Sequence, residues 1–163
     1  MDFRKGRVWP MPAASGGGTK DYCSFYNSTG GVTGVGSTAT TLNLNTERLD
    51  SGIGALSSNE VTISKTADFA ISADVYFNNR STSRTEYSIW LEVDGGGGFA
   101  EVAGSRSAIY QRGYDSGQSA SINLQLAVTT GDKFRLRVQR TDGGATVGYQ
   151  DSNGTRISFQ ELG

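Results

Sequence analysis

The sequence predicts an all-β fold in which two antiparallel sheets pack face to face, and three observations support this prediction. Apolar side chains recur at every second residue over most of the chain, as expected of strands that bury one face. Turn-forming residues separate these runs at the spacing of a β-sandwich. The chain also has 23 glycines and only 2 prolines, and no window shows the period of an amphipathic helix.

Strands are predicted wherever the two-residue alternation is clear, and residues 69–77 give the strongest signal. There, large apolar side chains alternate with smaller or more polar ones. Shorter strands are predicted at residues 42–45, 61–63, 87–93, 122–128, 134–138 and 157–159. Turns are predicted at the Gly-, Ser-, Asn- and Asp-rich residues 30–31, 57–59, 95–98, 131–132, 142–144 and 152–154. Together these elements make one domain at residues 21–163.

Residues 1–20 lack the alternation and are predicted to form an anchoring arm and a glycine hinge. Pro10, Pro12 and the glycines at 16–18 interrupt regular structure. Apolar side chains lie between basic ones, a composition typical of interface hot spots. We expect the arm to dock on a partner through Phe3, Arg4, Arg7, Val8, Trp9 and Met11. The alternative is an unstructured tail, since chain ends often fray.

The composition argues against catalysis. The chain has no histidine and one cysteine, Cys23, which excludes Ser-His-Asp and Cys-His nucleophiles, the usual zinc sites and an internal disulfide. The formal net charge is −1, and no apolar run is long enough for a membrane helix. We therefore expect no enzyme activity, no cofactor, no metal, and no nucleic-acid or membrane partner. No apolar run of a secretory signal follows the basic N-terminus, which favours synthesis in the cytoplasm.

Three local patterns leave chemical alternatives open. Carboxylates in the second half of the chain could form the acid–base pair of a glycosidase, although such side chains also keep strands soluble. They are Glu86, Glu92, Asp94, Glu101 and Asp115. Residues 151–154 begin like a calcium loop but lack its later acidic ligands, so a turn is favoured. The glycine clusters at 30–36 and 95–98 lack the Lys-Ser/Thr ending of a phosphate-binding loop.

Arginines and tyrosines could form a surface for acidic glycans or nucleic acid. The candidates are Arg106, Arg112, Arg135, Arg137, Arg140 and Arg156, with Tyr110, Tyr114 and Tyr149. Acidic residues bring the net charge close to zero, so a solvated face or contacts between subunits are favoured.

Two aromatic residues, Tyr76 and Trp90, fall on the side opposite the apolar rows. In a lone sandwich both would face water, which suggests a second buried surface. We expect both at the interface of a symmetric oligomer. The alternative is that they are scattered surface aromatics.

Three segments resemble a known family. Residues 65–75, KTADFAISADV, are similar to the strand G-x-Y/F-x-F/V-S of C1q and tumour-necrosis-factor (TNF)-like domains, although Asp68 replaces the glycine before the aromatic residue. Residues 126–136, LAVTTGDKFRL, resemble the hairpin L-x-x-G-D-x-V/F-x-L, and residues 155–162 take the place of the closing strand. Over residues 21–162 the resemblance implies a ten-strand jelly roll that forms trimers about a threefold axis.

The sequence looks most like the jelly rolls of bacteriophage virion proteins, such as head decorations, fibres and tail adhesins. This resemblance implies a non-enzymatic structural protein, made in the host cytoplasm and displayed on the virion surface. We expect a homotrimer anchored through the arm to a capsid or tail protein. The alternative is a tail-fibre adhesin that binds a host receptor or glycan through loops at residues 78–86, 94–99 and 113–118. A C1q-like signalling ligand would need an export route.

Overall fold

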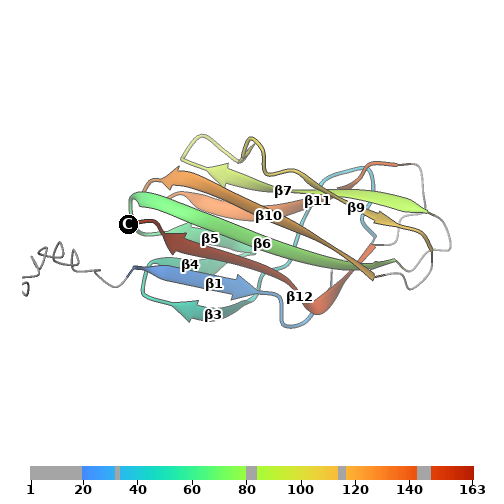
Figure 1. Cartoon of the computed structure of the whole chain (residues 1–163), viewed down its shortest axis with the longest axis horizontal. Helices are drawn as coiled ribbons and strands as arrows, with labels where there is room; N and C mark the ends of the chain where they lie inside the picture. Colours follow the sequence, from blue (N-terminus) through green and yellow to red (C-terminus); the bar gives the residue numbers. More distant parts are fainter. Residues whose placement is uncertain (1–19, 32–33, 80–83, 114–116, 143–147) are drawn as a thin grey trace, which may run out of the picture.

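The computed structural model describes residues 20–31, 34–79, 84–113, 117–142 and 148–163. Within these ranges the chain forms twelve strands and no helix, and the strands make two antiparallel sheets that pack face to face (Figure 1). The predicted all-β, two-sheet fold is confirmed. The predicted arm, apart from Lys20, lies outside the described residues. The described residues contain no helix that could cross a membrane.

The strands vary widely in length. The longest are β6 (Ala67–Asn79), β7 (Thr85–Asp94), β10 (Gly117–Val128), β11 (Lys133–Arg140) and β12 (Gly148–Glu161). The shorter ones are β1 (Tyr22–Tyr26), β2 (Thr40–Thr41), β3 (Thr46–Asp50), β4 (Gly54–Ser57), β5 (Glu60–Ile63), β8 (Ala100–Glu101) and β9 (Ser107–Gln111). One sheet has five strands in the order β10-β6-β12-β1-β3. The other has seven, with β4-β5-β11-β7-β8 as its main path, β2 paired to β11 and β9 paired to β7.

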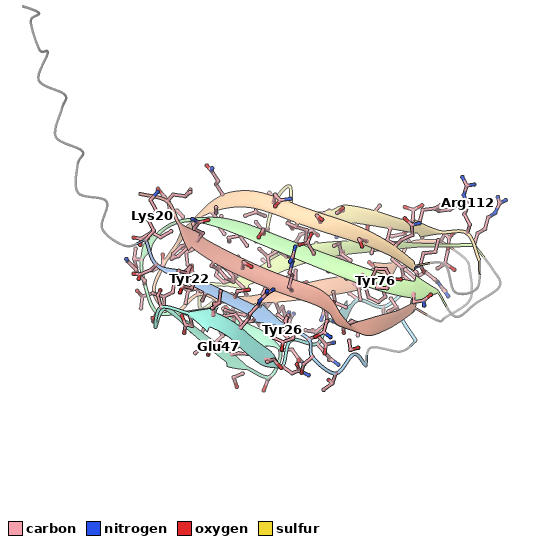
Figure 2. All side chains as sticks on the ribbon, turned by 60° about the horizontal axis from the view of Figure 1, so that its bottom comes forward. Lys20, Tyr22, Tyr26, Glu47, Tyr76 and Arg112 are labelled. Carbon is pink, nitrogen blue, oxygen red and sulfur yellow. The ribbon has the colours of Figure 1, made fainter. Side chains whose placement is uncertain are left out.

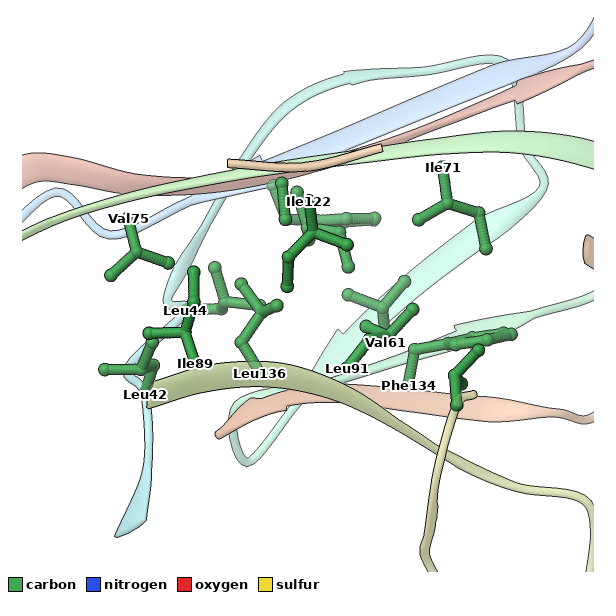
Figure 3. Packing of buried hydrophobic residues seen from close by; sticks show 14 of the residues in the cluster. Leu42, Leu44, Val61, Ile71, Val75, Ile89, Leu91, Ile122, Phe134 and Leu136 are labelled. Atoms are coloured by element: carbon green, nitrogen blue, oxygen red, sulfur yellow. The ribbon is translucent and has the colours of Figure 1, made fainter. Parts of the chain in front are cut away.

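Strand β6 lies inside the five-stranded sheet, between β10 and β12, and the clear alternation at residues 69–77 correctly predicts a strand there. Its inward side chains, Phe69, Ile71, Ala73, Val75 and Phe77, are at most 1% exposed. Figure 3 shows Ile71 and Val75 pointing toward apolar side chains of the opposite sheet. One apolar core between the sheets therefore holds the fold together.

Residues 42–45 are buried as predicted but do not form the predicted strand. Leu42 and Leu44 are at most 1% exposed, yet these residues connect β2 in one sheet to β3 in the other. Their backbone amides make isolated hydrogen bonds and no strand ladder. Leu42 N donates to Leu136 O at 2.9 Å, and Leu44 N donates to the Asn59 side chain at 3.1 Å. Alternation of apolar and polar residues shows that one side of an extended segment is buried. A segment that crosses between two sheets has this property as well as a strand.

The predicted turn at 152–154 is wrong, because β12 runs through it. Gln150 pairs with Phe77 and Thr155 with Val75, so residues 151–154 face a single residue of β6. This bulge is held by backbone bonds from Asn153 N to Asn27 O and from Asn27 N to Thr155 O. By contrast, the turn predicted at 57–59 is confirmed: Ser58 and Asn59 both have positive φ between β4 and β5.

Cys23 is buried in the core and makes no disulfide. Its burial raises the pKa of the thiol to about 12, because the thiolate would lose its hydration. A thiol in this state is unreactive at neutral pH, and Cys23 acts as a small apolar side chain.

A clasp of three charged residues closes the end of the sandwich where β1 begins and β12 ends. Lys65 Nζ lies 2.7 Å from Asp21 Oδ2 and 2.8 Å from Glu161 Oε2. The backbone amide of Asp21 also donates to Glu161 Oε2 at 3.1 Å. The hydrogen bonds from Lys65 lower the pKa of both carboxyl groups, and the same bonds raise the pKa of Lys65.

This clasp makes stability depend on pH in acid. Because the folded pKa values of Asp21 and Glu161 are depressed, their contribution is complete above the ordinary carboxyl pKa of about 4 and is lost as pH falls below it. We expect Lys65→Met to lower the thermal midpoint at neutral pH and the difference from the wild type to vanish in acid. Thermal unfolding at a series of pH values measures this. Lys133→Met, at an exposed site without an ion pair in the described ranges, serves as control, and a Lys65→Met difference that does not change with pH contradicts the assignment.

Candidate functional site

The outer face of the five-stranded sheet is built from small, mostly uncharged side chains. Strand register places Ser24, Ser158, Ser72 and Asn123 in one row across β1, β12, β6 and β10. The hydroxyls of Ser24 and Ser158 lie 3.1 Å apart within this row. A second row holds Tyr22, Gln160, Ala70 and Gln125, and a third holds Tyr26, Arg156, Asp74 and Ser121. We call these three rows the small-residue face.

Charge is almost absent from this face. Among its twelve positions only Asp74 and Arg156 are charged, and they pair with each other, with Arg156 Nε donating to Asp74 Oδ2 at 2.7 Å. Ser121 donates to the other oxygen of Asp74. The face therefore carries little net charge, unlike a typical solvated surface.

Between the first two rows lies a shallow groove of about 440 Å³. Its rim consists of uncharged side chains of β6, β10 and β12 that belong to these two rows. They are Ala70, Ser72, Asn123, Gln125, Ser158 and Gln160. Large apolar side chains lie at the β1–β3 edge of the same face, where Tyr22 is 44% and Leu49 is 54% exposed. Figure 2 shows Tyr22, Tyr26 and Tyr76 on this sheet.

Tyr76 lies on the outer side of β6, as the sequence predicts, but it is only partly exposed. Its ring passes over Gly117 of β10, where any side chain would collide with the tyrosine. A glycine at this position thus lets the ring lie flat on the sheet. A role for Tyr76 between subunits stays a prediction.

The expectation that Trp90 faces water in a single subunit is wrong. Trp90 does point outward from β7, but only 4% of it is exposed. The guanidinium of Arg106 stacks on its ring at 4.2 Å, and its indole nitrogen donates to Glu92 Oε1 at 3.1 Å. The chain itself therefore covers this aromatic side chain. Trp90 and Tyr76 lie on opposite outer faces, so the structure does not bring them into one patch.

Glu92 is the centre of a network on the outer face of the seven-stranded sheet. Its carboxylate accepts from Arg135 Nε at 2.7 Å and lies 3.5 Å from Arg137 Nε. Arg137 also donates to Thr41 Oγ1 at 2.6 Å, and Arg135 stacks on Phe99 at 3.8 Å. With a side chain only 13% exposed, Glu92 ties β7 to β11 by a charge-assisted hydrogen bond. Arg137 extends the network to β2.

The contacts of the carboxylates that could form a glycosidase pair are as follows for three of the described ones. Glu92 and Glu101 are neighbours across β7 and β8, but Glu92 is bound by Arg135 and Glu101 by Arg106. The Asp94 carboxylate accepts hydrogen bonds from the backbone amides of Gly96 and Gly98. These bonds lower the pKa of Asp94 and shape the predicted turn at 95–98. Asp115 lies outside the described residues. Glu92, Glu101 and Asp94 thus act in structural contacts.

The arginines that could form a single binding surface are divided between two faces. Arg106, Arg135 and Arg137 belong to the network around Glu92 and Glu101, whereas Arg156 lies on the small-residue face. Arg112 projects from the far end of the molecule (Figure 2). Tyr114 and the side chain of Tyr149 lie outside the described residues. Within the described part of the chain no three acidic or cysteine side chains gather as metal ligands would.

Comparison with solved structures defines the class of fold: the chain is a TNF-like jelly roll. A crystal structure of murine APRIL at pH 8.0 matches it with a TM-score of 0.64, covering 88% of this chain and 99% of that chain at 13% sequence identity. The structure of Eiger TNF from S. frugiperda matches with a TM-score of 0.63, covering 88% of this chain and 93% of that chain at 14% identity.

The likeness to these structures confirms the predicted jelly-roll fold, and at this identity it shows the fold alone. No protein-family model matches the sequence, and neither does any curated protein. The expected place on a bacteriophage particle therefore stays a prediction.

Proposed function

We propose that this chain is a non-enzymatic structural module that assembles as a homotrimer through the first two rows of the small-residue face, on either side of the groove. The observation that carries the proposal is the character of this face: short, nearly uncharged side chains, with exposed Tyr22 and Leu49 at one edge. Such a surface allows close approach of a second backbone, and it lacks the unpaired charges that interface cores exclude. The trimer is the assembly that the TNF-like resemblance implies. In a closed ring of three, one part of the face in each copy contacts a different part of the face in the next copy.

The proposed setting is the surface of a bacteriophage particle, with residues 1–20 anchoring the trimer to a capsid or tail protein. The sequence supports this through the arm, whose Phe3, Val8, Trp9 and Met11 lie among basic residues. Mass spectrometry of purified particles tests it, because a structural protein is present in a fixed copy number that is a multiple of three. Cryo-electron microscopy of the same particles would show where the arm binds. Absence of the chain from mature particles contradicts this setting.

The trimer is tested by Ser158→Arg. Ser158 lies in the middle of the central row and points away from the core, so a monomer should tolerate arginine there. In the trimer the long cationic side chain would be forced into the interface, and we expect trimers to dissociate into monomers. Light scattering coupled to size-exclusion chromatography measures the mass, and circular dichroism verifies the fold.

The matched control is Ser57→Arg, at an exposed site on the other sheet, which should leave the trimer intact. A wild-type chain that is monomeric at micromolar concentration, or a Ser158→Arg variant that stays trimeric, contradicts the proposed face.

The second candidate function is that of an adhesin that binds a host glycan. A polar pocket at the β1–β3 edge of the same sheet, lined by Tyr26, Arg48, Asn153 and Arg156, favours it. Tyr26 and Arg156 belong to the third row and β3 is the edge strand. The pocket therefore lies to one side of the groove and is compatible with assembly through the first two rows.

A further inference from the structure

Two irregularities in the five-stranded sheet occur next to each other. In the β1–β3 ladder, Ser24 pairs with Leu49 and Phe25 with Glu47, so Arg48 is an extra residue in β3. In the β12–β6 ladder, residues 151–154 are the bulge opposite Tyr76. Bulges redirect individual side chains and are enriched beside functional sites.

Both bulges deliver a side chain to one pocket. The extra residue in β3 places Arg48 beside the outer face, and the bulge in β12 places Asn153 there. Together with Tyr26 and Arg156 they line a hollow of about 300 Å³. Asn153 has a positive φ of 62°, an uncommon backbone conformation for a residue other than glycine that is often found at functional sites.

The pocket has an excess of positive charge. Arg156 pairs with Asp74, whereas Arg48 forms no hydrogen bond or ion pair anywhere in the described ranges. The acidic neighbours of Arg48 on β3, Glu47 and Asp50, do not line the pocket. Of the two guanidinium groups that line the pocket, only that of Arg156 is paired with a carboxylate, which leaves one charge to be matched by a ligand.

The remaining lining groups suit a sugar. The Tyr26 ring offers an apolar surface against which a pyranose ring can pack, and its hydroxyl can exchange hydrogen bonds with sugar hydroxyls. The Asn153 side-chain amide supplies two donors and an acceptor and has no partner in the described part of the chain. A hollow of this volume is at the small end of the range for ligand sites and matches a single monosaccharide.

We propose that this pocket binds an acidic sugar through its carboxylate. Arg48 and the free side of Arg156 hold the carboxylate, Tyr26 packs against the ring, and Asn153 bonds to ring hydroxyls. A guanidinium matches a planar carboxylate with two parallel hydrogen bonds. The inference rests on the second proposed function, recognition of a glycan, and names the class of sugar. A single excess charge fits a monocarboxylate better than a nucleic acid, which needs an extended basic surface.

The test is a titration of the full chain followed by amide NMR spectra. N-acetylneuraminic acid is the probe, its methyl ester lacks the carboxylate charge, and N-acetylglucosamine is the neutral sugar. We expect saturable shifts at millimolar probe concentrations, confined to residues around Tyr26, Arg48 and Asn153, and no such shifts with the ester or the neutral sugar. Arg48→Gln should weaken binding about tenfold.

Arg112→Gln is the matched control, since Arg112 is an exposed arginine at the far end of the molecule and its loss should leave binding unchanged. Absence of shifts at the pocket, equal binding of the ester, or equal weakening by both variants overturns the proposal. The molar mass of every sample is measured in parallel. If Arg48→Gln dissociates the trimer and the wild type does not respond to the sugar, the pocket is a contact between copies, and only the sugar site is refuted.

Discussion

Replacing Phe159 by alanine is expected to lower the free energy of unfolding by about 3–5 kcal/mol. Phe159 is 1% exposed and belongs to β12, inside the five-stranded sheet. Its ring packs edge-on against Phe69 of the same sheet at 6.5 Å between centroids and lies 5.1 Å from Phe134 of the opposite sheet. Truncation would remove an aromatic contact between the two layers and leave a cavity that the surrounding strands cannot fill.

Chemical denaturation followed by circular dichroism measures this effect. The matched control is Tyr110→Ala on the other sheet, where the aromatic side chain is 45% exposed and truncation should cost far less. A Phe159→Ala variant with nearly wild-type stability would show that the two sheets do not depend on this aromatic cluster. Because assembly also stabilises a fold, both variants should be compared at the same protein concentration.

Replacing Glu92 by alanine is expected to cost about 2–3 kcal/mol, more than for an exposed ion pair and less than for a fully buried one. The change would leave Arg135 and the Trp90 indole without their common acceptor and Arg137 without its ion-pair partner. The side chains of these arginines are only 23% and 18% exposed, so water can replace the carboxylate only in part. Equilibrium unfolding in urea gives the difference directly.

Glu101→Ala is the control for this network, since the Glu101–Arg106 pair is more exposed, at 38% and 44%, and should matter little. Glu92→Gln should recover part of the loss because an amide oxygen can still accept from Trp90. If Glu92→Ala and Glu101→Ala lower the free energy of unfolding by the same amount, the burial of Glu92 does not strengthen the stabilising effect of its ion pairs.

The sequence predicts the sandwich well where burial and strand pairing coincide. In β6 the residues that alternate in polarity are also the residues that pair in the sheet, because both neighbouring strands, β10 and β12, are in regular register with β6 over most of its length. At residues 42–45 the two diverge: side chains remain buried while the backbone leaves one sheet for the other. Periodicity alone does not distinguish these cases.

Trp90 illustrates a different limit of sequence analysis. The register correctly gives its outward direction, but the exposure of a side chain also depends on what packs over it. Arg106, which covers the ring, lies 16 residues further along the chain, beyond β8. No local pattern predicts that contact, although an arginine near an outward tryptophan is a pairing that protein surfaces favour.

The pocket at the β1–β3 edge could be predicted only in small part. The dipeptide at residues 153–154, Asn-Gly, signals a positive φ, and the structure has it inside a bulge instead of a hairpin turn. Nothing in the segment 46–50 marks Arg48 as the extra residue in its strand, because a bulge is set by the register of the partner strand. Sites built on bulges therefore become visible only with the three-dimensional pairing.

The clasp formed by Lys65, Asp21 and Glu161 marks the end of the domain at which both termini of the described chain lie. It ties the first and last strands together at one pole, where Lys20 also lies next to Gly163, and both ends of the described chain leave from that pole (Figure 1). Tyr26, by contrast, ends β1 on the side away from this pole. If residues 1–20 hold the protein to a particle, whatever is fused to its C-terminus will face inward, and the pocket beside Tyr26 will lie farther out, toward the surroundings.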